Sequence, residues 1–309
     1  MAELDVLVEE IADLRPLPPI AAQVLQIAEG DTFSAHELAQ AISSDPALTA
    51  RVLRVANSSY YGFPRRITTI RDAVVLLGFR QVRSTLLATS AIRSMPSYEH
   101  IEAGAFWRHS IVVGLLAELI ARHEGVHQDE AFTAGVLHNV GRLALEQARP
   151  EQFGRARELA IGRGVSMHEA ERLVLGFTDA EVGGALARRW DFPAELADAI
   201  AGHTQLPSTP EARQSLAGIV ARARAFAAEH GLTDGVDRAA RPAPAPLSPF
   251  AATMLAMSPA DLPERAAEPA DTAAPTTEPV LDQLIAEQGG IEHVLDRAAA
   301  FVEHTAASP

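Results

Sequence analysis

The stretch from Ala131 to Leu143, AFTAGVLHNVGRL, sets a polar pair, His138-Asn139, inside an otherwise apolar segment. The preceding stretch, Phe106 to Arg122, has apolar residues at helical spacing and carries His109. The sequence contains no Gly-rich phosphate loop of the Walker type and no serine in a nucleophile elbow. These two helical segments therefore hold the strongest candidate for a functional site.

Residues typical of helix starts and helix ends lie on both sides of these segments. Apolar residues recur at three-to-four spacing in nearly every segment up to Gly231, and strand signals are weak. Helix starts are indicated by Ser34 with Glu37, Ser166 with Glu169, Asp45-Pro46 and Thr209-Pro210. Helix ends are indicated by Gly62, Gly78, Gly125 and Gly231. The pattern predicts an all-α fold, a compact multi-helix globule with short connections.

The composition agrees with helices and excludes several classes of protein. Of 309 residues, 48% are hydrophobic but only 5% aromatic, so the core is built mostly from Ala, Leu, Val and Ile. Without cysteine there is no disulfide, thiol nucleophile or Cys-ligated zinc, which leaves His, Asp and Glu as side-chain metal ligands. The net charge of -14 argues against a nucleic-acid partner. Because no signal peptide or long uncharged apolar run is present, we expect a cytoplasmic protein without a membrane partner.

The chain divides into a helical domain, a linker and a tail. The domain is expected at residues 1–235, and residues 236–279 form a Pro/Ala-rich linker. From Asp237 to Pro279, 43 residues include 9 Pro and 13 Ala. Helical spacing returns at residues 280–305, with a break at Gly289-Gly290, which predicts a tail of one or two helices.

Charge is unevenly distributed along the chain. Between Pro46 and Met95 there are eight arginines and one acid, Asp72, whereas from Glu229 to Pro309 there are thirteen acids and four arginines. The basic residues are either ordinary solvated or paired helix faces, or a face for an anion or a partner protein that the acidic tail can approach. The candidate face comprises Arg51, Arg54, Arg65, Arg66, Arg80 and Arg83. The adjacent turn at residues 57–62 either simply ends a helix or takes part in recognising an anion.

A helical histidine followed by a His-Asp pair resembles the core of the HD superfamily of metal-dependent phosphohydrolases. The resemblance implies imidazoles and carboxylates that hold hard divalent ions and activate water against a phosphoester. Here the aspartate is replaced by Asn139, next to His138, with His109 on the earlier helix. A neutral amide cannot bridge two cations as a carboxylate does.

Other positions of that resemblance also depart from the pattern. Residues 175–184, LGFTDAEVGG, are similar to a region where a histidine commonly precedes Ala-Glu-Val-Gly, and Asp179 stands there. Of a usual histidine pair, His203 remains and is followed by Thr204. Arg224 occupies the helix that supplies the last carboxylate in active members. The resemblance thus implies a vestigial HD site, which comprises His109, His138, Asn139, Asp179, His203 and Arg224.

Seven further motifs appear in an order that resembles the HDOD family, HD-related output domains of bacterial signalling proteins. They are Leu17-Pro18-Pro19, residues 42–48 (ISSDPAL), 54–58 (RVANS), Tyr61-Gly62, 73–78 (AVVLLG), 106–110 (FWRHS) and 190–193 (WDFP). The resemblance covers about Leu14 to Gly231. It implies an N-terminal helical part, residues 14–95, packed on a degenerate HD-like part, residues 100–232, and a regulatory rather than hydrolytic role.

Three functions remain open at this point. The first is a non-catalytic signalling module that binds another protein; the resemblance implies a place in cyclic-dinucleotide or two-component signalling. The second is a nucleotide sensor that uses the former phosphate pocket, made electropositive by Arg142 and Arg224. The third is a cryptic phosphohydrolase with Asp179 or a glutamate in place of the lost carboxylate. We expect no cofactor and no bound metal, although two histidines with Asp179 could still form a weak metal site.

Overall fold

The structure is a computed structural model. It describes residues 2–14, 46–58, 66–78, 98–127, 130–190, 192–236 and 279–306, and a few single positions between 38 and 82. Every regular element in these residues is a helix, so the predicted all-α class is confirmed. Most of the predicted linker and the predicted helix start at Ser34 lie outside the described residues.

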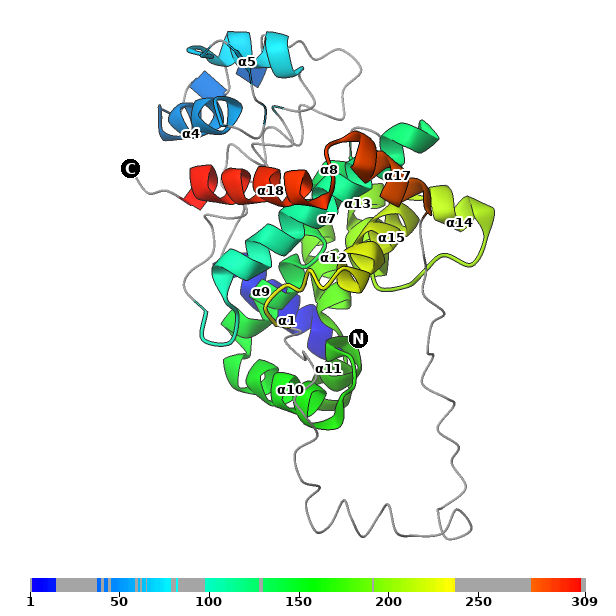
Figure 1. Cartoon of the computed structure of the whole chain (residues 1–309). Coiled ribbons are helices and arrows are strands. Elements are labelled where there is room, and N and C mark those ends of the chain that lie inside the picture. The colour runs from blue at the N-terminus through cyan, green and yellow to red at the C-terminus, as the bar shows by residue number, and fades with distance from the viewer. Residues whose placement is uncertain are drawn as a thin grey trace, which may run out of the picture.

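Short connections join the helices between residues 103 and 229, and Figure 1 labels all the described helices. They are α1 (Ala2–Leu14), α4 (Pro46–Ala56), α5 (Ile70–Leu77), α7 (Ala103–Glu124), α8 (Ala131–Leu137), α9 (Val140–Ala148), α10 (Pro150–Arg163), α11 (Met167–Leu175), α12 (Asp179–Arg189), α13 (Ala194–Gly202), α14 (Pro210–Gln214), α15 (Leu216–Glu229), α17 (Pro279–Glu287) and α18 (Ile291–Ala306).

Local sequence signals account for many of the helix ends. The Ser166 side chain accepts the Glu169 N–H at the start of α11, and Thr209 accepts the Ala212 N–H before α14, which begins at Pro210. Gly125 takes a left-handed conformation, φ 74°, directly after α7. The predicted ends at Gly78 and Gly231 also have positive φ. Cap chemistry legible in the sequence therefore sets several helix boundaries, whereas α8, α9 and α13 begin without a side-chain cap.

The long helix α7 forms the centre of the HD-like part. It packs against α8, α15 and α18, and much of its surface is buried. By length and composition α7 could cross a membrane, but 67% of its apolar window is buried inside this fold. Gly135 of α8 lies against Gly114 of α7, where a Cβ on Gly135 would collide with the Gly114 backbone. This close approach brings the end of α8, and with it the His138-Asn139 pair, beside α7.

The N-terminal part has a small core of its own. Residues of α4, α5 and the segment between them pack together with single positions before and after them. The buried members are Leu38, Ala39, Ile42, Val52, Ala56, Ile67, Ile70, Ala73, Val74 and Val82. The first helix, α1, does not join this group but packs against α12 and α9 of the HD-like part.

The predicted tail consists of two helices that belong to the main core. Leu281 and Ile285 of α17, and Val294 and Phe301 of α18, are buried in the same cluster as α7. Figure 1 shows α18 lying between α4 and α7, and it contacts both helices. Within the described residues, the tail meets the N-terminal part where α18 contacts α4.

Candidate functional site

Three predicted histidines from separate elements meet in the HD-like part. His109 lies on α7, His138 at the end of α8 and His203 at the end of α13. The ring centroids of His109 and His138 are 5.4 Å apart, and those of His138 and His203 are 5.0 Å apart. All three side chains are buried. The fold thus gathers these imidazoles as the resemblance implied.

Each of the three rings faces a backbone carbonyl with its Nδ1 atom. The partners are Leu232 for His109 at 2.8 Å, Gly135 for His138 at 2.6 Å and Ile200 for His203 at 2.7 Å. Because a carbonyl only accepts, each Nδ1 carries the hydrogen and donates it. The Nε2 atoms of His138 and His203 are buried and have no hydrogen-bond partner within the described residues. Each of these two rings therefore keeps a lone pair on Nε2.

Burial keeps these rings neutral. The pKa of His203 is lowered to about 3, chiefly by burial; the charge of Asp179 opposes this change, and the charges of Arg224 and His168 contribute to it. Burial also lowers the pKa of His138 well below its ordinary value, helped by the neighbouring His203 and His109. The pKa of His109 is lowered by burial in the same way. At neutral pH the three imidazoles therefore carry no charge.

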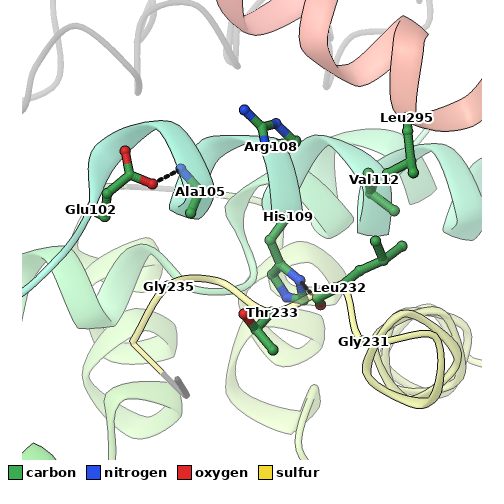
Figure 2. Close-up of a pocket in the computed structure, with 10 residues that line it drawn as sticks. All are labelled: Glu102, Ala105, Arg108, His109, Val112, Gly231, Leu232, Thr233, Gly235 and Leu295. Atoms are coloured by element: carbon green, nitrogen blue, oxygen red, sulfur yellow. Dashed lines mark hydrogen bonds between the residues drawn. The ribbon is translucent and has the colours of Figure 1, made fainter. Parts of the chain in front are cut away.

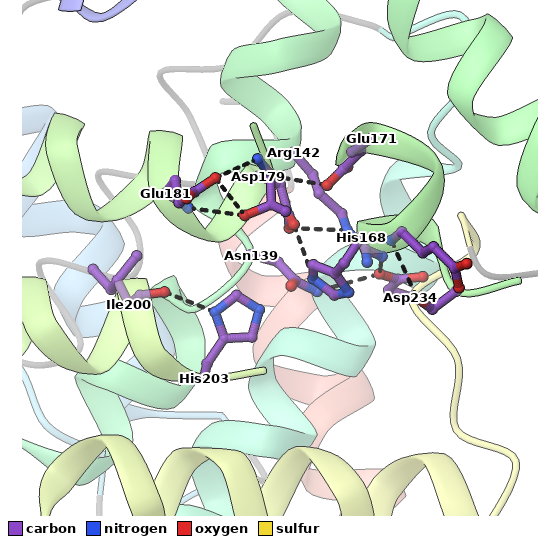
Figure 3. Close-up of polar contacts among 12 residues, drawn as sticks. Asn139, Arg142, His168, Glu171, Asp179, Glu181, Ile200, His203 and Asp234 are labelled. Carbon is purple, nitrogen blue, oxygen red and sulfur yellow. Dashed lines mark hydrogen bonds and ion pairs between the residues drawn. The ribbon is translucent and has the colours of Figure 1, made fainter. Parts of the chain in front are cut away.

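A buried arginine holds the remaining carboxylates of the site (Figure 3). The Arg142 Nε donates to Asp179 Oδ2 at 3.0 Å, and its Nη1 contacts Asp234 Oδ2. The Asn139 Nδ2 donates to the same Asp234 oxygen at 3.2 Å. All four side chains are buried. Gly141 makes this arrangement possible, because a Cβ there would collide with the Asp179 carbonyl.

Helix α11 brings two acid–base groups that sequence reasoning missed. His168 Nε2 lies 2.9 Å from Asp179 Oδ1, and Glu171 accepts the Asp179 backbone N–H at 2.9 Å. Burial alone would raise the pKa of Asp179, but the charges of His168 and Arg142 outweigh it and hold that pKa well below its ordinary value. Burial, and then the negative charge of Asp179, raises the pKa of Glu171 well above its ordinary value.

The last carboxylate of the site comes from a place that the sequence reasoning did not identify. We expected Arg224 of α15 to have replaced it, and Arg224 is half-buried there and lowers the pKa of His109, His138 and His203 through its charge. Asp234, beyond the end of α15, is the carboxylate in contact with Asn139 and Arg142. The available signal was the Thr233-Asp234-Gly235 turn directly after the helix, where Asp234 Oδ1 also accepts the Val236 N–H.

The sequence comparison decides the family. The sequence model of the HDOD domain matches residues 14–206, more than half of the chain. The chain belongs to the HDOD domain family. Within the HDOD match lie all of the vestigial site residues except Arg224, and Asp234 also lies beyond it.

Solved structures of other proteins share this fold, and a further relative matches by sequence. An HDOD domain protein of unknown function from Geobacter sulfurreducens superposes with a TM-score of 0.71 at 24% identity over 98% of both chains. A protein from Marinobacter aquaeolei VT8, provisionally named a signal transduction protein, gives a TM-score of 0.69 at 21% identity over 99% of this chain and 65% of its own. An uncharacterized protein of Treponema pallidum is 27% identical over 69% of this chain, which matches only 42% of that longer relative.

The HDOD site does not fit the pair of metal ions that the HD resemblance implies. Such a pair needs a carboxylate that bridges both ions, whereas Asn139 offers an amide that donates to Asp234. The two remaining carboxylates, Asp179 and Asp234, are already bound by the Arg142 guanidinium. Two further divalent ions would have to share these carboxylates with a fixed positive charge.

A cavity opens beside His109 (Figure 2). It has a volume of about 520 Å³ and lies between α7, the segment after α15 and α18. Arg108 is exposed at this cavity, and His109 lines it from α7. The residues that line it are Glu102, Ala105, Arg108, His109, Val112, Gly231, Leu232, Thr233, Gly235 and Leu295.

Part of the predicted basic face borders a second hollow, in the N-terminal part. Arg54 and Arg66 line this hollow of about 830 Å³ together with apolar side chains of α4 and the following segment. The Asn57 side chain donates to the Leu53 and Ile67 carbonyls and accepts the Ile67 N–H, each at 2.7 Å, so it fixes the backbone there. The side chain of Arg51, and the residues Arg65, Arg80 and Arg83, lie outside the described part.

Proposed function

We propose that this HDOD protein is a non-catalytic regulatory module that acts by binding another signalling protein. The observation that carries the proposal is the Arg142 guanidinium, which is bound to both Asp179 and Asp234 beside the Asn139 amide. Phosphoester hydrolysis in the HD manner needs cations at this place to bind the phosphate and lower the pKa of water. A guanidinium supplies positive charge but no open coordination position for water.

The surrounding fold supports a role as a rigid binding scaffold. The site is buried, and its groups are used to connect α9, α12 and the segment after α15. The provisional signal-transduction name of the Marinobacter aquaeolei relative agrees with this role. Cyclic-dinucleotide or two-component signalling is the network in which we place the module. A cytoplasmic location belongs to the same proposal, since the apolar helix α7 is used as a core helix.

Turnover of phosphoesters tests the non-catalytic part of the proposal. We expect the full chain, supplied with Mn²⁺ or Fe²⁺, to release no more product from a model phosphodiester or a cyclic dinucleotide than the variant His138→Ala. Turnover that rises with protein concentration and disappears in His138→Ala would overturn the proposal.

The hollow lined by Arg54 and Arg66 offers a test of the partner-binding part. Arg66 is exposed, and the hollow combines positive charge with apolar surface. Crosslinking of the full chain in extract of its native cells should yield a discrete partner, whose yield falls in Arg66→Glu. Arg163→Glu, an exposed substitution at the far end of α10, serves as the matched control and should leave the yield unchanged. Equal loss in both variants would argue against this surface.

Nucleotide sensing is a second candidate, favoured by the cavity of Figure 2 rather than by the Arg142 side of the site. Its volume of about 520 Å³ is in the range of small-molecule sites, and Arg108 supplies a cation for phosphate. A nucleotide that binds the folded state raises Tm, and Arg108→Ala should reduce that rise. A screen of mononucleotides and cyclic dinucleotides at millimolar concentration without any rise in Tm would dismiss this candidate.

A further inference from the structure

Three potential metal ligands converge on the side of Asp179 that faces away from Arg142. One nitrogen or oxygen atom each from His168, Asp179 and His203 lies within 4.8 Å of the other two. For His203 this atom is Nε2, because its Nδ1 donates to the Ile200 carbonyl. The group is assembled from three elements, namely α11, the start of α12 and the end of α13.

One of these atoms is buried without any partner. His203 Nε2 has no hydrogen-bond partner within the described residues. His168 Nε2 and Asp179 Oδ1 meet each other as an ion pair at 2.9 Å. Buried polar atoms in folded proteins are normally satisfied, so His203 Nε2 points to a missing partner beside this ion pair.

We propose that His168, Asp179 and His203 form a binding site for a single divalent first-row transition ion. Two imidazole nitrogens and one carboxylate oxygen suit ions of the zinc and cobalt class better than Mg²⁺ or Ca²⁺, which prefer oxygen ligands. Three protein ligands leave a fourth position for water or a partner's group.

Neighbouring groups fix the orientation of two ligands, as is usual around protein metals. The Ile200 carbonyl holds the His203 ring at 2.7 Å, and Arg142 Nε holds the second oxygen of Asp179 at 3.0 Å, which leaves Oδ1 for an ion. Glu171 accepts the Asp179 backbone N–H at 2.9 Å and adds a carboxyl group near the site. The charges of Arg142 and Arg224 oppose a cation here, whereas the carboxylates of Asp179 and Asp234 attract it.

The site has room to adjust at one of its ligands. The His168 side chain is 15% exposed, whereas Asp179 and His203 are buried, so His168 is the least confined of the three. Zinc bonds of about 2.0–2.1 Å place two ligand atoms roughly 3.3 Å apart. His168 Nε2 and Asp179 Oδ1, now 2.9 Å apart, would therefore have to separate only slightly. A partly exposed histidine at the start of a helix can make this shift without repacking the core.

This site overlaps only in part with the pair of metal ions that the HD resemblance implies. Asp179 and His203 stand at positions of that pattern, but His109 and the His138-Asn139 pair are not ligands here, and His168 belongs to no motif of the resemblance. The inference goes beyond the regulatory function proposed above, and it does not require the bound ion to support hydrolysis. The ion would tie α11, α12 and α13 together, so its binding would stabilise the HD-like part.

Titration with Co²⁺ of the untagged, chelator-treated full chain tests the inference. We expect visible absorption bands that saturate at one Co²⁺ per chain, loss of these bands on addition of Zn²⁺, and a rise in Tm. His168→Gln, which changes a partly exposed side chain, should weaken binding by at least about 100-fold, since even residues that only orient a ligand change affinity by 10- to 100-fold. His203→Gln should weaken it similarly.

His109→Gln is the control, because His109 belongs to the same histidine cluster but is not a proposed ligand. It should bind Co²⁺ as the unchanged chain does. The inference is overturned if the folded chain binds neither ion at high micromolar concentration, or if His168→Gln binds as tightly as the unchanged chain. It is also overturned if His109→Gln loses binding and His168→Gln keeps it. Failure to bind metal leaves the proposed regulatory function standing, whereas phosphoester turnover would remove that function alone.

Discussion

Arg142 is fully buried between two carboxylates, which it neutralises. Arg142→Met would leave Asp179 and Asp234 buried without their counter-ion, and we expect the free energy of unfolding to fall by about 3 to 5 kcal/mol. Urea denaturation measures this. Arg122→Met, which removes an exposed ion pair with Glu118, should cost at most about 1 kcal/mol. Equal losses in the two variants would contradict the role given to Arg142.

The neutral histidines predict how stability changes with pH. The pKa of His203 is about 3 in the folded chain against 6.5 ordinarily, so the unfolded chain binds the extra proton first as pH falls. The contribution of the neutral His203 to the free energy of unfolding is then fully present above pH 6.5. Below that pH it declines, by up to about 1.4 kcal/mol per pH unit. Urea denaturation between pH 7.5 and 5 should show a shallower decline in His203→Gln. An unchanged slope in that variant would argue against a neutral His203.

The sequence predicted about half of the site at this scale. His109, His138, Asn139 and Asp179 were found because they stand in motifs with a fixed order, and the structure brings them into one buried region. His168, Glu171 and Asp234 were missed, since each is an ordinary helix or turn residue until tertiary packing brings it beside Asp179 or Asn139. Single-sequence spacing contains no information about that packing.

Among elements, the close contact between α9 and α12 positions Arg142 beside Asp179. A Cβ on Gly141 would collide with the Asp179 carbonyl and lie 2.7 Å from the Gly183 nitrogen. Gly141→Ala should therefore separate the two helices and lower stability by about 1 to 3 kcal/mol. Gly162→Ala is the matched control, because nothing lies within 4 Å of a Cβ there and helix propensity alone predicts a gain of up to about 1 kcal/mol. A stabilising Gly141→Ala would refute the contact.

Helix boundaries were the most predictable elements of the chain. Ser166, Thr209-Pro210, Gly125 and Gly231 occupy the cap positions that their chemistry favours. The partners of each helix were less predictable. Within the described residues, α1 packs mainly on α9 and α12, although nothing in its apolar spacing distinguishes one partner surface from another.

For the whole molecule, the C-terminal helices are part of the folded unit rather than a separate tail. Phe301 of α18 is fully buried and meets Phe132 of α8 with ring centroids 6.0 Å apart. Phe301→Ala should lower the stability of the entire chain by about 3 to 5 kcal/mol within a single unfolding transition. Val280→Ala, at a side chain that is 43% exposed, should change stability by less than about 0.5 kcal/mol. A separate early transition in Phe301→Ala would show that α18 is independent of the domain.

The contrast between a basic first part and an acidic C-terminal end corresponds to two parts of the chain that are in contact in the structure. The acidic C-terminal helix α18 lies between α4 and α7, so its position relative to the two parts depends on both cores (Figure 1). The composition predicted the contrast between a basic first part and an acidic end, but it could not predict that buried apolar residues of α17 and α18 complete the core.

Under the proposed function, Asn139 and Arg142 leave the HD-like fold without hydrolytic activity. A single-turnover assay tests this most directly, with the full chain in excess over a labelled cyclic dinucleotide and with Mn²⁺ present. We expect no cleavage above that of His138→Ala over the longest practical time. Cleavage that follows one exponential, scales with the amount of folded chain and is lost in His138→Ala would contradict it.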